Sequence, residues 1–268
     1  MVTEFANQVV LVTGAGGRIG RAVCGQFARE GARVACCDLD PTRAQAVADG
    51  IRQAGLAAVA VPGDVADERQ VRAIVQETTR ALGPIDVLVN CAGIFPNCPV
   101  VEMDVAGWDR VFAVNVRGPM LLCREVARQM IARHAAGAII NITSPAGSSA
   151  RTGGSHYCGS KAALNLLTHT LAIELGPHGI RVNAVSPGLV LDEVVSNDRP
   201  PADEYPLAIL RGIPLGRTGT GDEIAPAVLF AASRERAGYM NGAIIEVTGG
   251  AHAGRPHLPP SRRVAKQE

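Results

Sequence analysis

Short apolar runs alternate along the chain with longer segments in which apolar residues recur every three or four positions. The runs have the length of strands, and several are apolar almost throughout. A strand that is apolar on both faces is typical of a parallel sheet that helices cover on both sides. The alternation predicts strands at Val9–Thr13, Arg33–Cys37, Ala57–Val61, Ile85–Val89, Ala138–Thr143, Arg181–Val185 and Ala243–Val247.

The segments between these runs have the periodicity of helices that bury one face. They predict helices at Ile19–Glu30, Pro41–Ala54, Glu68–Leu82, Gly107–Arg133, His156–Gly176 and Asp222–Ser233. Because strands and helices alternate, we expect βαβ units with right-handed crossovers. The prediction is therefore an α/β fold with one doubly wound parallel sheet of about seven strands and helices on both faces. Residues 1–251 would form a single domain, with a switch point between the first and fourth strands.

Two segments do not follow this alternation. Leu189–Gly212 is long, carries many acidic residues and follows Pro187-Gly188 at the end of a predicted strand. We expect a lid over the substrate, and the alternative is an ordinary surface loop. Residues 252–268 contain prolines and basic residues but few apolar ones, so we expect a flexible basic tail.

Composition excludes several classes of function. The net charge of the 268 residues is +1 and only 3% of them are aromatic, which argues against a nucleic-acid partner. No apolar run approaches the ~20 residues that span a bilayer, and the start of the chain lacks a signal-peptide pattern. We therefore expect a cytoplasmic protein with no membrane partner. The seven cysteines form no C-x-x-C pair and the six histidines are scattered, so we expect neither a metal site nor disulfides.

A glycine-rich turn follows the first predicted strand. Thr13-Gly14-Ala15-Gly16-Gly17-Arg18-Ile19-Gly20 leads directly into a helical pattern. In such a turn, backbone N–H groups and a helix N-terminus can contact a pyrophosphate, although the turn alone is a weak signal. Asp38 ends the second strand, 18 residues after Gly20, where a carboxylate can bind the ribose hydroxyls of a dinucleotide.

A second pattern combines Ser144, Tyr157 and Lys161. On a helix, Tyr157 and Lys161 lie one turn apart, with about 5–6 Å between their Cβ atoms. The ammonium would favour the ionised phenol, so Lys161 is expected to lower the pKa of Tyr157 from its usual value near 10. Ser144 follows the strand Ala138–Thr143, which places its hydroxyl at the carboxyl edge of the sheet, where ligands bind in open α/β sheets.

Taken together, these residues resemble the short-chain dehydrogenase/reductase family, and the resemblance covers about residues 5–251. Further matching positions are Asp64-Val65, Asn90-Cys91-Ala92-Gly93, Asn115-Val116, Asn183, Pro187-Gly188 and Val247-Thr248-Gly249-Gly250. The resemblance implies that Tyr157 exchanges a proton with the substrate oxygen while a hydride passes to or from the nicotinamide. It implies that Ser144 bonds the same oxygen and that Lys161 also binds the nicotinamide ribose. Asn115 would hold a water for proton relay to the lysine.

The resemblance also implies the residues that bind the cofactor. These are Gly14, Gly17, Arg18, Ile19, Gly20, Asp38, Leu39, Asp64, Val65, Asn90, Ala92, Gly93, Tyr157, Lys161, Pro187, Gly188 and Val190. Asp38 favours NAD, since the 2′-phosphate of NADP would face a like charge. Two positions depart from the family pattern. Arg18 replaces a glycine and could reach the pyrophosphate or a 2′-phosphate. Asp192 stands where a threonine often bonds the carboxamide of the nicotinamide, a bond that an ionised aspartate cannot donate.

The implied function is an oxidoreductase that transfers a hydride between NAD(H) and a secondary alcohol or ketone carbon, in a homotetramer. Two alternatives stay open: an NADPH-linked 3-oxoacyl thioester reductase, which Asp38 disfavours, and a catalytically silent dinucleotide-binding regulatory protein. The sequence does not identify the substrate. Its pocket should be lined by Phe95–Asn97, Pro145–Thr152 and the lid. Cys91 and Cys158 fall inside site motifs and are expected to be inert packing residues. His156 is expected to be structural or solvent-facing.

Overall fold

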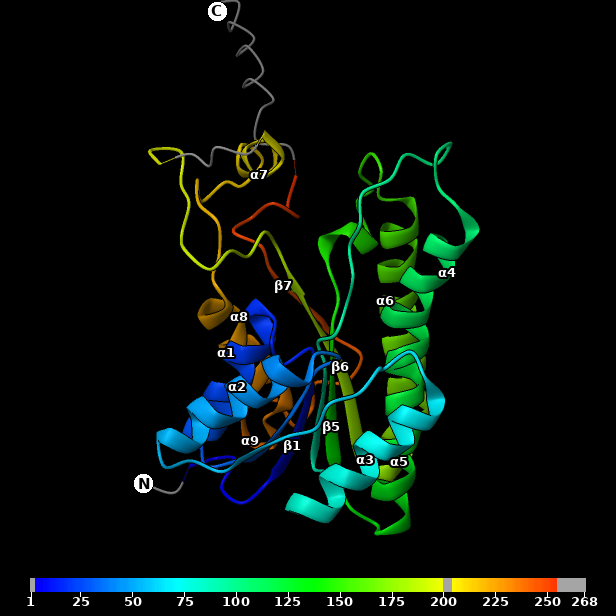
Figure 1. Cartoon of the computed structure of the whole chain (residues 1–268), viewed down its shortest axis with the longest axis vertical. Coiled ribbons are helices and arrows are strands. Elements are labelled where there is room, and N and C mark those ends of the chain that lie inside the picture. The colour runs from blue at the N-terminus through cyan, green and yellow to red at the C-terminus, as the bar shows by residue number, and fades with distance from the viewer. Residues whose placement is uncertain (1–2, 200–203, 255–268) are drawn as a thin grey trace, which may run out of the picture.

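The computed structural model describes residues 3–199 and 204–254, and its centre is one sheet of seven parallel strands (Figure 1). Along the sheet the order is β3-β2-β1-β4-β5-β6-β7. The strands are β1 (Val9–Thr13), β2 (Arg33–Cys37), β3 (Ala58–Ala60), β4 (Val87–Asn90), β5 (Gly137–Ile142), β6 (Ile180–Pro187) and β7 (Ile244–Val247). Because β1 lies between β2 and β4, the switch point falls between the first and fourth strands, as predicted.

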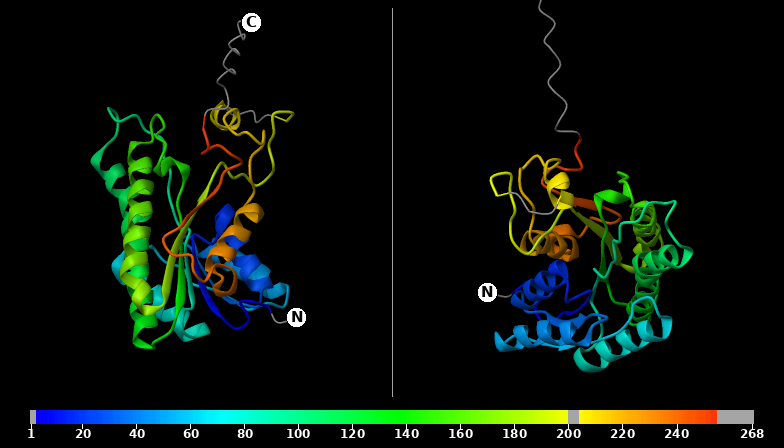
Figure 2. Two further views of the ribbon diagram at one scale, coloured as in Figure 1. Left: turned by 180° about the vertical axis from the view of Figure 1, so that it is seen from behind. Right: turned by 45° about the horizontal axis from the view of Figure 1, so that its top comes forward.

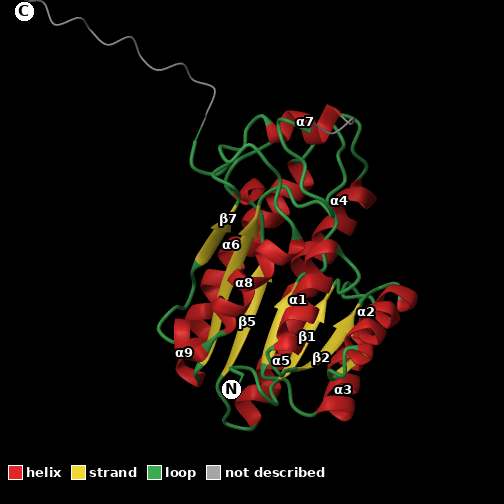
Figure 3. Ribbon diagram, turned by 90° about the vertical axis from the view of Figure 1, so that its left-hand side faces the viewer, coloured by secondary structure: helices red, strands yellow, loops and turns green. Residues whose placement is uncertain are grey.

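Helices cover both faces of this sheet (Figures 2 and 3). On one face lie α1 (Arg18–Arg29), α2 (Pro41–Gln53) and α8 (Gly221–Ala232). On the other face lie α3 (Glu68–Leu82), α5 (Gly118–Ala132) and α6 (Ser155–Leu175). The shorter helices are α4 (Val105–Phe112), α7 (Glu204–Leu210) and α9 (Arg234–Ala237). This three-layer arrangement confirms the predicted doubly wound α/β fold.

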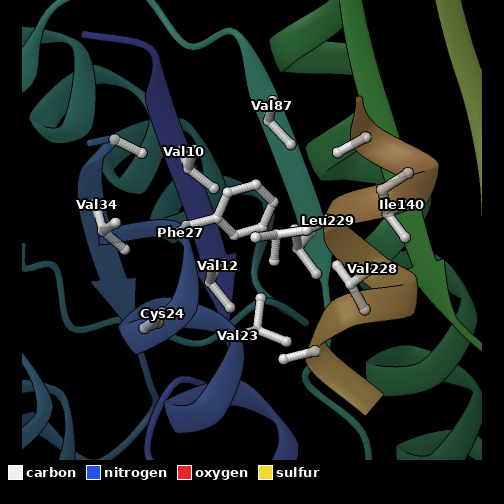
Figure 4. Close-up of a cluster of buried hydrophobic side chains, with 14 of the residues drawn as sticks. Val10, Val12, Val23, Cys24, Phe27, Val34, Val87, Ile140, Val228 and Leu229 are labelled. Atoms are coloured by element: carbon white, nitrogen blue, oxygen red, sulfur yellow. The ribbon is translucent and has the colours of Figure 1, made fainter. Parts of the chain in front are cut away.

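The two layers of core explain why the strands are apolar on both sides. Val10 and Val12 of β1 point into the cluster that includes α1 and α8, where Phe27 is fully buried (Figure 4). Val9 and Leu11 of the same strand belong to the cluster on the opposite face. With both faces covered, alternating polar residues would leave polar groups buried without water, so the strand is apolar throughout.

Side-chain caps distinguish α1 from its neighbours. The helices α2, α3 and α4 begin after Asp40, Asp67 and Asp104, whose carboxylates accept hydrogen bonds from backbone N–H groups of the first turn. By contrast, α1 begins after Gly17, which offers no side chain to its first turn. The N–H groups at the start of α1 therefore have no side-chain acceptor at the N-cap position.

The prediction of one continuous helix at Gly107–Arg133 was wrong. The segment contains α4, a π-helical turn at Ala113–Arg117 and then α5. In this turn the backbone N–H of Gly118 donates to the carbonyl of Ala113, five residues earlier. Pro119 gives a physical reason, because it has no N–H to donate to the carbonyl of Asn115, the α-helical partner four residues back.

Other differences concern element ends and the two irregular segments. Strand β3 is shorter than predicted, β4 begins two residues later, and α9 was not predicted. The predicted lid contains α7, but its residues 200–203 lie outside the described part of the chain. The predicted tail is described only as far as residue 254. Within the ranges that the structure describes, no helix is long and apolar enough to cross a membrane.

Candidate active site

The glycine-rich turn packs directly against the segment that follows β4. Gly14 has φ +64°, and a Cβ placed on it would lie 2.8 Å from the Cα of Ala92. Thr13 joins the same two segments, because its hydroxyl accepts hydrogen bonds from the backbone N–H groups of Cys91 and Ala92, both at 3.2 Å. Glycine at position 14 thus allows two carboxyl ends of strands to meet. Thr13 had not been identified as part of this junction.

The remaining glycines of the turn bring α1 close to it. A Cβ on Gly20 would lie 2.1 Å from the carbonyl oxygen of Gly14, so only glycine fits between the helix and the turn. Gly17 is exposed, and Ile19 packs against the adjoining core. The exposed backbone at Gly17 and the uncapped start of α1 form the kind of surface that binds a phosphate group.

Asp38 lies beside this turn at the carboxyl end of β2. Its carboxylate accepts a hydrogen bond of 2.9 Å from the backbone N–H of Gly16. Arg43 of α2 borders the same place, since a Cβ on Gly16 would lie 2.5 Å from the Cβ of Arg43. The guanidinium of Arg43 pairs with Asp40 at 3.7 Å. A cation therefore lies near Asp38, which the sequence reasoning had missed.

Asp64, Val65 and Leu39 lie around the strand ends at this side of the sheet. Asp64 caps its own turn by accepting from the backbone N–H of Ala66 at 2.8 Å, and it pairs with Arg110 at 3.2 Å. Val65 is buried. Leu39 is 61% exposed, although it is a large apolar residue. This exposed leucine places an apolar surface next to Asp38 and the glycine-rich turn.

Asn90 acts inside the sheet. Its side-chain amide is buried and donates to the amide oxygen of Asn141 on β5 at 2.8 Å. The amide nitrogen of Asn141 in turn donates to the hydroxyl of Thr168 on α6 at 2.9 Å. The Asn90 side chain therefore links β4 to β5 and stabilises the sheet at this edge. At the end of Asn90-Gly93, a Cβ on Gly93 would lie 3.4 Å from Asn115 Oδ1 and 3.7 Å from Lys161 Nζ, so Gly93 lies next to both side chains.

Asn115 is fully buried in the π-helical turn. Its side chain accepts from the backbone N–H of Ile94 and donates to the carbonyl of the same residue, both at 2.9 Å, and it also donates to Ser160 Oγ at 3.0 Å. Asn115 thereby ties the segment after β4 to α6. Because Pro119 cannot bond to the Asn115 carbonyl, that oxygen is left with no α-helical donor.

Ser144, Tyr157 and Lys161 come together at the carboxyl edge of the sheet. Ser144 follows β5 and accepts a hydrogen bond from the backbone N–H of Ala146 at 3.2 Å. The Ser144 side chain is also hydrogen-bonded to the side chain of Tyr157. Lys161 is buried, donates to the carbonyl of Ile142 at 2.8 Å, and lies with its Nζ 5.8 Å from the centre of the Tyr157 ring.

The electrostatics of this group differ from the expectation. Burial raises the pKa of Tyr157 above its usual value, and the interactions that oppose this rise are the hydrogen bond with Ser144 and the charge of Arg151. We had expected Lys161 to supply the opposing charge. Burial instead lowers the pKa of Lys161 itself to about 8, and its ammonium is directed at the Ile142 carbonyl.

Arg151 and Phe95 complete the surroundings of Tyr157. The guanidinium carbon of Arg151 lies 4.9 Å from the centre of the phenol ring, and Phe95 meets the ring edge-on at 6.3 Å between centroids. Both residues lie in segments that we expected to line the substrate pocket. The proximity of an arginine to the tyrosine was not predicted, because nothing in the sequence specifies where the loop after Ser144 turns back.

Asp192 joins the segment after β6 to α1. Its carboxylate forms an ion pair with Arg18 at 2.9 Å and a second one with Arg21. Hydrogen bonds from both arginines hold the pKa of Asp192 below its usual value. The two positions that depart from the family pattern are therefore partners of each other. Arg21 was not singled out from the sequence, although it lies one turn after Arg18.

The start of this segment runs along the last strand. Gly188 donates its N–H to the carbonyl of Val247 at 2.9 Å, and a Cβ on it would lie 2.9 Å from the Cα of Thr248. Pro187 ends β6, and Val190 pairs with Gly219 in an isolated parallel bridge. These contacts bring the residues after β6 to the same edge of the sheet as Ser144.

The remaining side chains of the motifs have packing roles. His156 is buried, and its Nδ1 accepts a hydrogen bond from the backbone N–H of Tyr157 at 2.9 Å, so the solvent-facing alternative is wrong. Burial raises the pKa of the Cys91 thiol to about 12. That thiol is protonated at neutral pH and is a poor nucleophile.

Comparisons with known proteins agree with this geometry. A family model described as enoyl-(acyl carrier protein) reductase matches residues 14–252. A (3R)-3-hydroxyacyl-CoA dehydrogenase of Canis lupus familiaris is 38% identical over 259 residues, which cover 92% of this chain and 97% of that protein. A galactitol 2-dehydrogenase of Agrobacterium fabrum is 38% identical over 252 residues, which cover 91% and 97% of the two chains. The crystal structure of a short-chain dehydrogenase/reductase from Mycobacterium marinum superposes with a TM-score of 0.85 at 34% identity, covering 93% of this chain and 97% of that one.

The chain belongs to the short-chain dehydrogenase/reductase family. Membership makes it an oxidoreductase that acts on CH–OH groups with a nicotinamide dinucleotide. The resemblance drawn from the sequence motifs is confirmed at this level.

Proposed function

We propose that this short-chain dehydrogenase/reductase transfers a hydride between NAD(H) and a secondary alcohol or ketone carbon, with Tyr157 as the acid and base. The observation that carries the proposal is the meeting of Tyr157, Ser144 and Lys161 at the sheet edge that also holds the glycine-rich turn. A substrate oxygen that accepts or donates at both hydroxyls would lie next to Tyr157 and Ser144. Its proton could then pass directly to or from the Tyr157 hydroxyl.

The residues around the turn fit a dinucleotide. The exposed Gly17 backbone and the uncapped start of α1 would hold the pyrophosphate, and the Asp38 carboxylate would accept from the adenosine ribose hydroxyls. Leu39 would contact the adenine, while Lys161 and Tyr157 would hold the nicotinamide ribose. When bound, the nicotinamide supplies the hydride acceptor or donor.

Charge supports NAD over NADP. A 2′-phosphate next to Asp38 would meet a like charge and would displace the ribose hydroxyl from its acceptor. Two arginines border this place, but Arg43 pairs with Asp40 and Arg18 pairs with Asp192. Their charges are thus partly compensated within the protein, so they offset only part of the repulsion from Asp38.

The proton path runs from Tyr157 towards the interior. In the oxidation direction Tyr157 must lose its proton before it can accept one from the substrate hydroxyl, and burial opposes that loss. Lys161 lies one turn further along α6, and Gly93 leaves room between Lys161 and Asn115. We assign to the Asn115 carbonyl, freed by Pro119, the acceptor position from which a water could link Lys161 to solvent.

Two substrate classes deserve a direct test. One relative is named a (3R)-3-hydroxyacyl-CoA dehydrogenase and another a galactitol 2-dehydrogenase, at 38% identity each. Both names describe oxidation of a secondary alcohol, so both are compatible with the chemistry of Tyr157. Residues 1–251 would form a single domain. Within it, the segment Leu189–Gly212 would cover the substrate as a lid.

A homotetramer and a cytoplasmic location remain predictions. Two large apolar side chains on α6 support an interface, since Leu166 is 66% and Ile173 is 77% exposed. Burying such side chains between subunits would remove apolar surface from water. Sedimentation at micromolar concentration should give a species of about four times 27.9 kDa, and a monomer alone would contradict the tetramer.

The decisive assay follows cofactor reduction with galactitol and with a (3R)-3-hydroxyacyl-CoA, each with NAD and with NADP. We expect kcat/KM to be at least about tenfold higher with NAD, a difference of about 1.4 kcal/mol. Tyr157→Phe should lower kcat by about 10²–10⁴-fold and leave NADH binding nearly intact, because only the hydroxyl is lost and Lys161 still holds the nicotinamide ribose. Tyr239→Phe removes a fully exposed hydroxyl and serves as the control. Retention of more than about a tenth of kcat in Tyr157→Phe would contradict the assignment.

A further inference from the structure

Among the residues that the structure describes, the cation closest to the Tyr157 ring is not on the helix that carries the tyrosine. The guanidinium carbon of Arg151 lies 4.9 Å from the ring centroid, whereas Lys161 Nζ lies 5.8 Å away. Arg151 belongs to the loop between the turn Pro145–Gly147 and α6. Nothing in the family motifs of this chain assigns a role to that position.

Two features of the loop allow Arg151 to lie over the ring: the space left by a glycine, and hydrogen bonds that fix the loop. Gly154 lies beneath the arginine side chain, because a Cβ on Gly154 would be 2.8 Å from Arg151 Cγ and 3.1 Å from Arg151 Nε. The loop is also bonded to the segment after β4. There the backbone N–H of Cys98 donates to the carbonyl of Gly153 at 2.8 Å, and the amide nitrogen of Asn97 can donate to the same carbonyl at 3.2 Å.

We propose that Arg151 is a positioning residue that stabilises the ionised form of Tyr157 when the tyrosine acts as a base, an inference that rests on the proposed role of Tyr157. A positive charge over the ring attracts the π-face of the neutral phenol and interacts more strongly with the negative charge of the phenolate. The interaction therefore favours the state that can accept a proton from an alcohol.

Arginine suits this role better than Lys161 does in the alkaline range. The ammonium of Lys161 is bonded to the Ile142 carbonyl, and burial lowers the pKa of Lys161 to about 8. Lys161 therefore loses its charge over the pH range in which a tyrosine begins to ionise. A guanidinium keeps its charge throughout that range. Of the two cations described beside the ring, Arg151 is thus the one that is still charged when Tyr157 becomes a phenolate.

The other groups around Tyr157 do not supply this charge. In the described part of the chain, Ser144 contributes a hydrogen bond and His156 accepts from the Tyr157 backbone through Nδ1. Cys158, the next residue, has the opposite effect, since a thiolate there would raise the pKa of Tyr157. Cys91 faces Lys161 from the segment after β4, and its thiol is neutral at neutral pH.

The ionisation of Tyr157 can be measured without any substrate. The chain has three tyrosines, so the absorbance at 295 nm of the wild type minus that of Tyr157→Phe isolates the Tyr157 phenolate. We expect Arg151→Met to raise the midpoint of this titration by about one pH unit, and Arg151→Lys to restore most of the shift. Gly154→Ala, which keeps the arginine but displaces it, should shift the midpoint in the same direction as Arg151→Met. Circular dichroism at each pH defines the range over which the variants stay folded.

A control variant distinguishes the effect of the Arg151 charge from the effect of removing any positive charge from the protein. Arg128→Met removes an exposed arginine that pairs with Glu125 on α5 and has no contact with the site, so it should leave the titration unchanged. In the oxidation assay, Arg151→Met should move the rising limb of kcat/KM to higher pH by the same amount. Arg151→Lys should move it back.

Several results would overturn the inference. Equal 295 nm difference signals in the wild type and Arg151→Met over the folded range would show that the guanidinium does not stabilise the phenolate. An increase in KM with an unmoved pH limb would make Arg151 a substrate-binding residue instead. If Tyr157→Phe keeps its activity while the titration shifts as expected, the proposed function fails and the electrostatic pairing of Arg151 with Tyr157 stands.

Discussion

Asp192 accepts a hydrogen bond of 2.9 Å from Nε of Arg18, although the two residues lie 174 positions apart in the chain. Arg21 binds the other oxygen of the same carboxylate. The segment after β6 is thereby attached to the first turn of α1, next to the exposed backbone of Gly17. The pair also reduces the positive charge that Arg18 presents to a dinucleotide.

Asp192→Asn should therefore change the preference between the two dinucleotides. Without the carboxylate, Arg18 and Arg21 are available to a 2′-phosphate, so kcat/KM for NADP relative to NAD should rise by about two- to fivefold. Exposed ion pairs have small effects, which sets this modest size. The double variant Arg18→Gly/Asp192→Asn should return the ratio towards the wild-type value. An unchanged ratio in Asp192→Asn would mean that Arg18 does not reach the ribose.

Lys161→Met should remove a gain in stability that the wild type makes as the pH rises from about 8 towards 10.5. The pKa of Lys161 is lowered from 10.5 to about 8 in the folded protein, so folding the charged lysine is unfavourable. This cost is fully present below about pH 8 and disappears as pH rises towards 10.5, so the wild type gains stability relative to Lys161→Met over that range. The full change corresponds to roughly 2–4 kcal/mol. Urea unfolding at pH 7, 8.5 and 10 measures it, and parallel curves would show that the lysine is not shifted.

Two glycine substitutions should have opposite effects. Gly20→Ala would place a Cβ 2.1 Å from the backbone carbonyl of Gly14, so we expect a loss of about 2 kcal/mol or more and weaker cofactor binding. Gly50→Ala on α2 has nothing within 4 Å of its new Cβ, and it should stabilise the protein by about 0.4–1 kcal/mol. Thermal unfolding and NADH fluorescence titration compare the two. Equal stability of the two variants would contradict the close approach of α1 to the turn.

Hydrogen exchange should identify the lid. If Leu189–Gly212 closes over the substrate, its amides should exchange quickly in the free enzyme and slow when cofactor and a substrate analogue are both bound. The contacts at Val190 and Asp192 should give the first residues of the segment more protection than the middle. Exchange that is unchanged in the ternary complex would make the segment an ordinary loop.

The sheet was predictable because its signals are local and redundant. Each strand is an apolar run such as Val9–Thr13, and each crossover contains a helix with one apolar face. The order of the strands follows from right-handed crossovers and one switch point. The strand ends were less predictable. For example, Ile85 is buried like a strand residue but precedes β4, since burial alone does not require ladder hydrogen bonds.

The site was predictable only where the motif itself fixes the geometry. Tyr157 and Lys161 share α6, so their spacing determined their proximity. The contact of Arg151 with Tyr157 and that of Asp192 with Arg18 depend on how loops fold back, and no periodicity encodes this. The lowered pKa of Lys161 depends on burial by several segments, which a single motif cannot show.

The π-helical turn at Ala113–Arg117 also fixes the rotational phase of α5. The hydrogen bond of a π-helical turn spans one residue more than that of an α-helical turn, so the turn absorbs one extra residue. Each later residue therefore has the phase that an uninterrupted α-helix would give the residue before it, a difference of about 100°. Deleting one residue between Ala113 and Arg117 would preserve a helix and shorten it by only about 1.5 Å. Leu122 and Val126 would keep facing the core, because in the uninterrupted α-helix that results both residues hold the phase they have now. The extra residue therefore matters for the backbone around Asn115 and not for which face of α5 is buried.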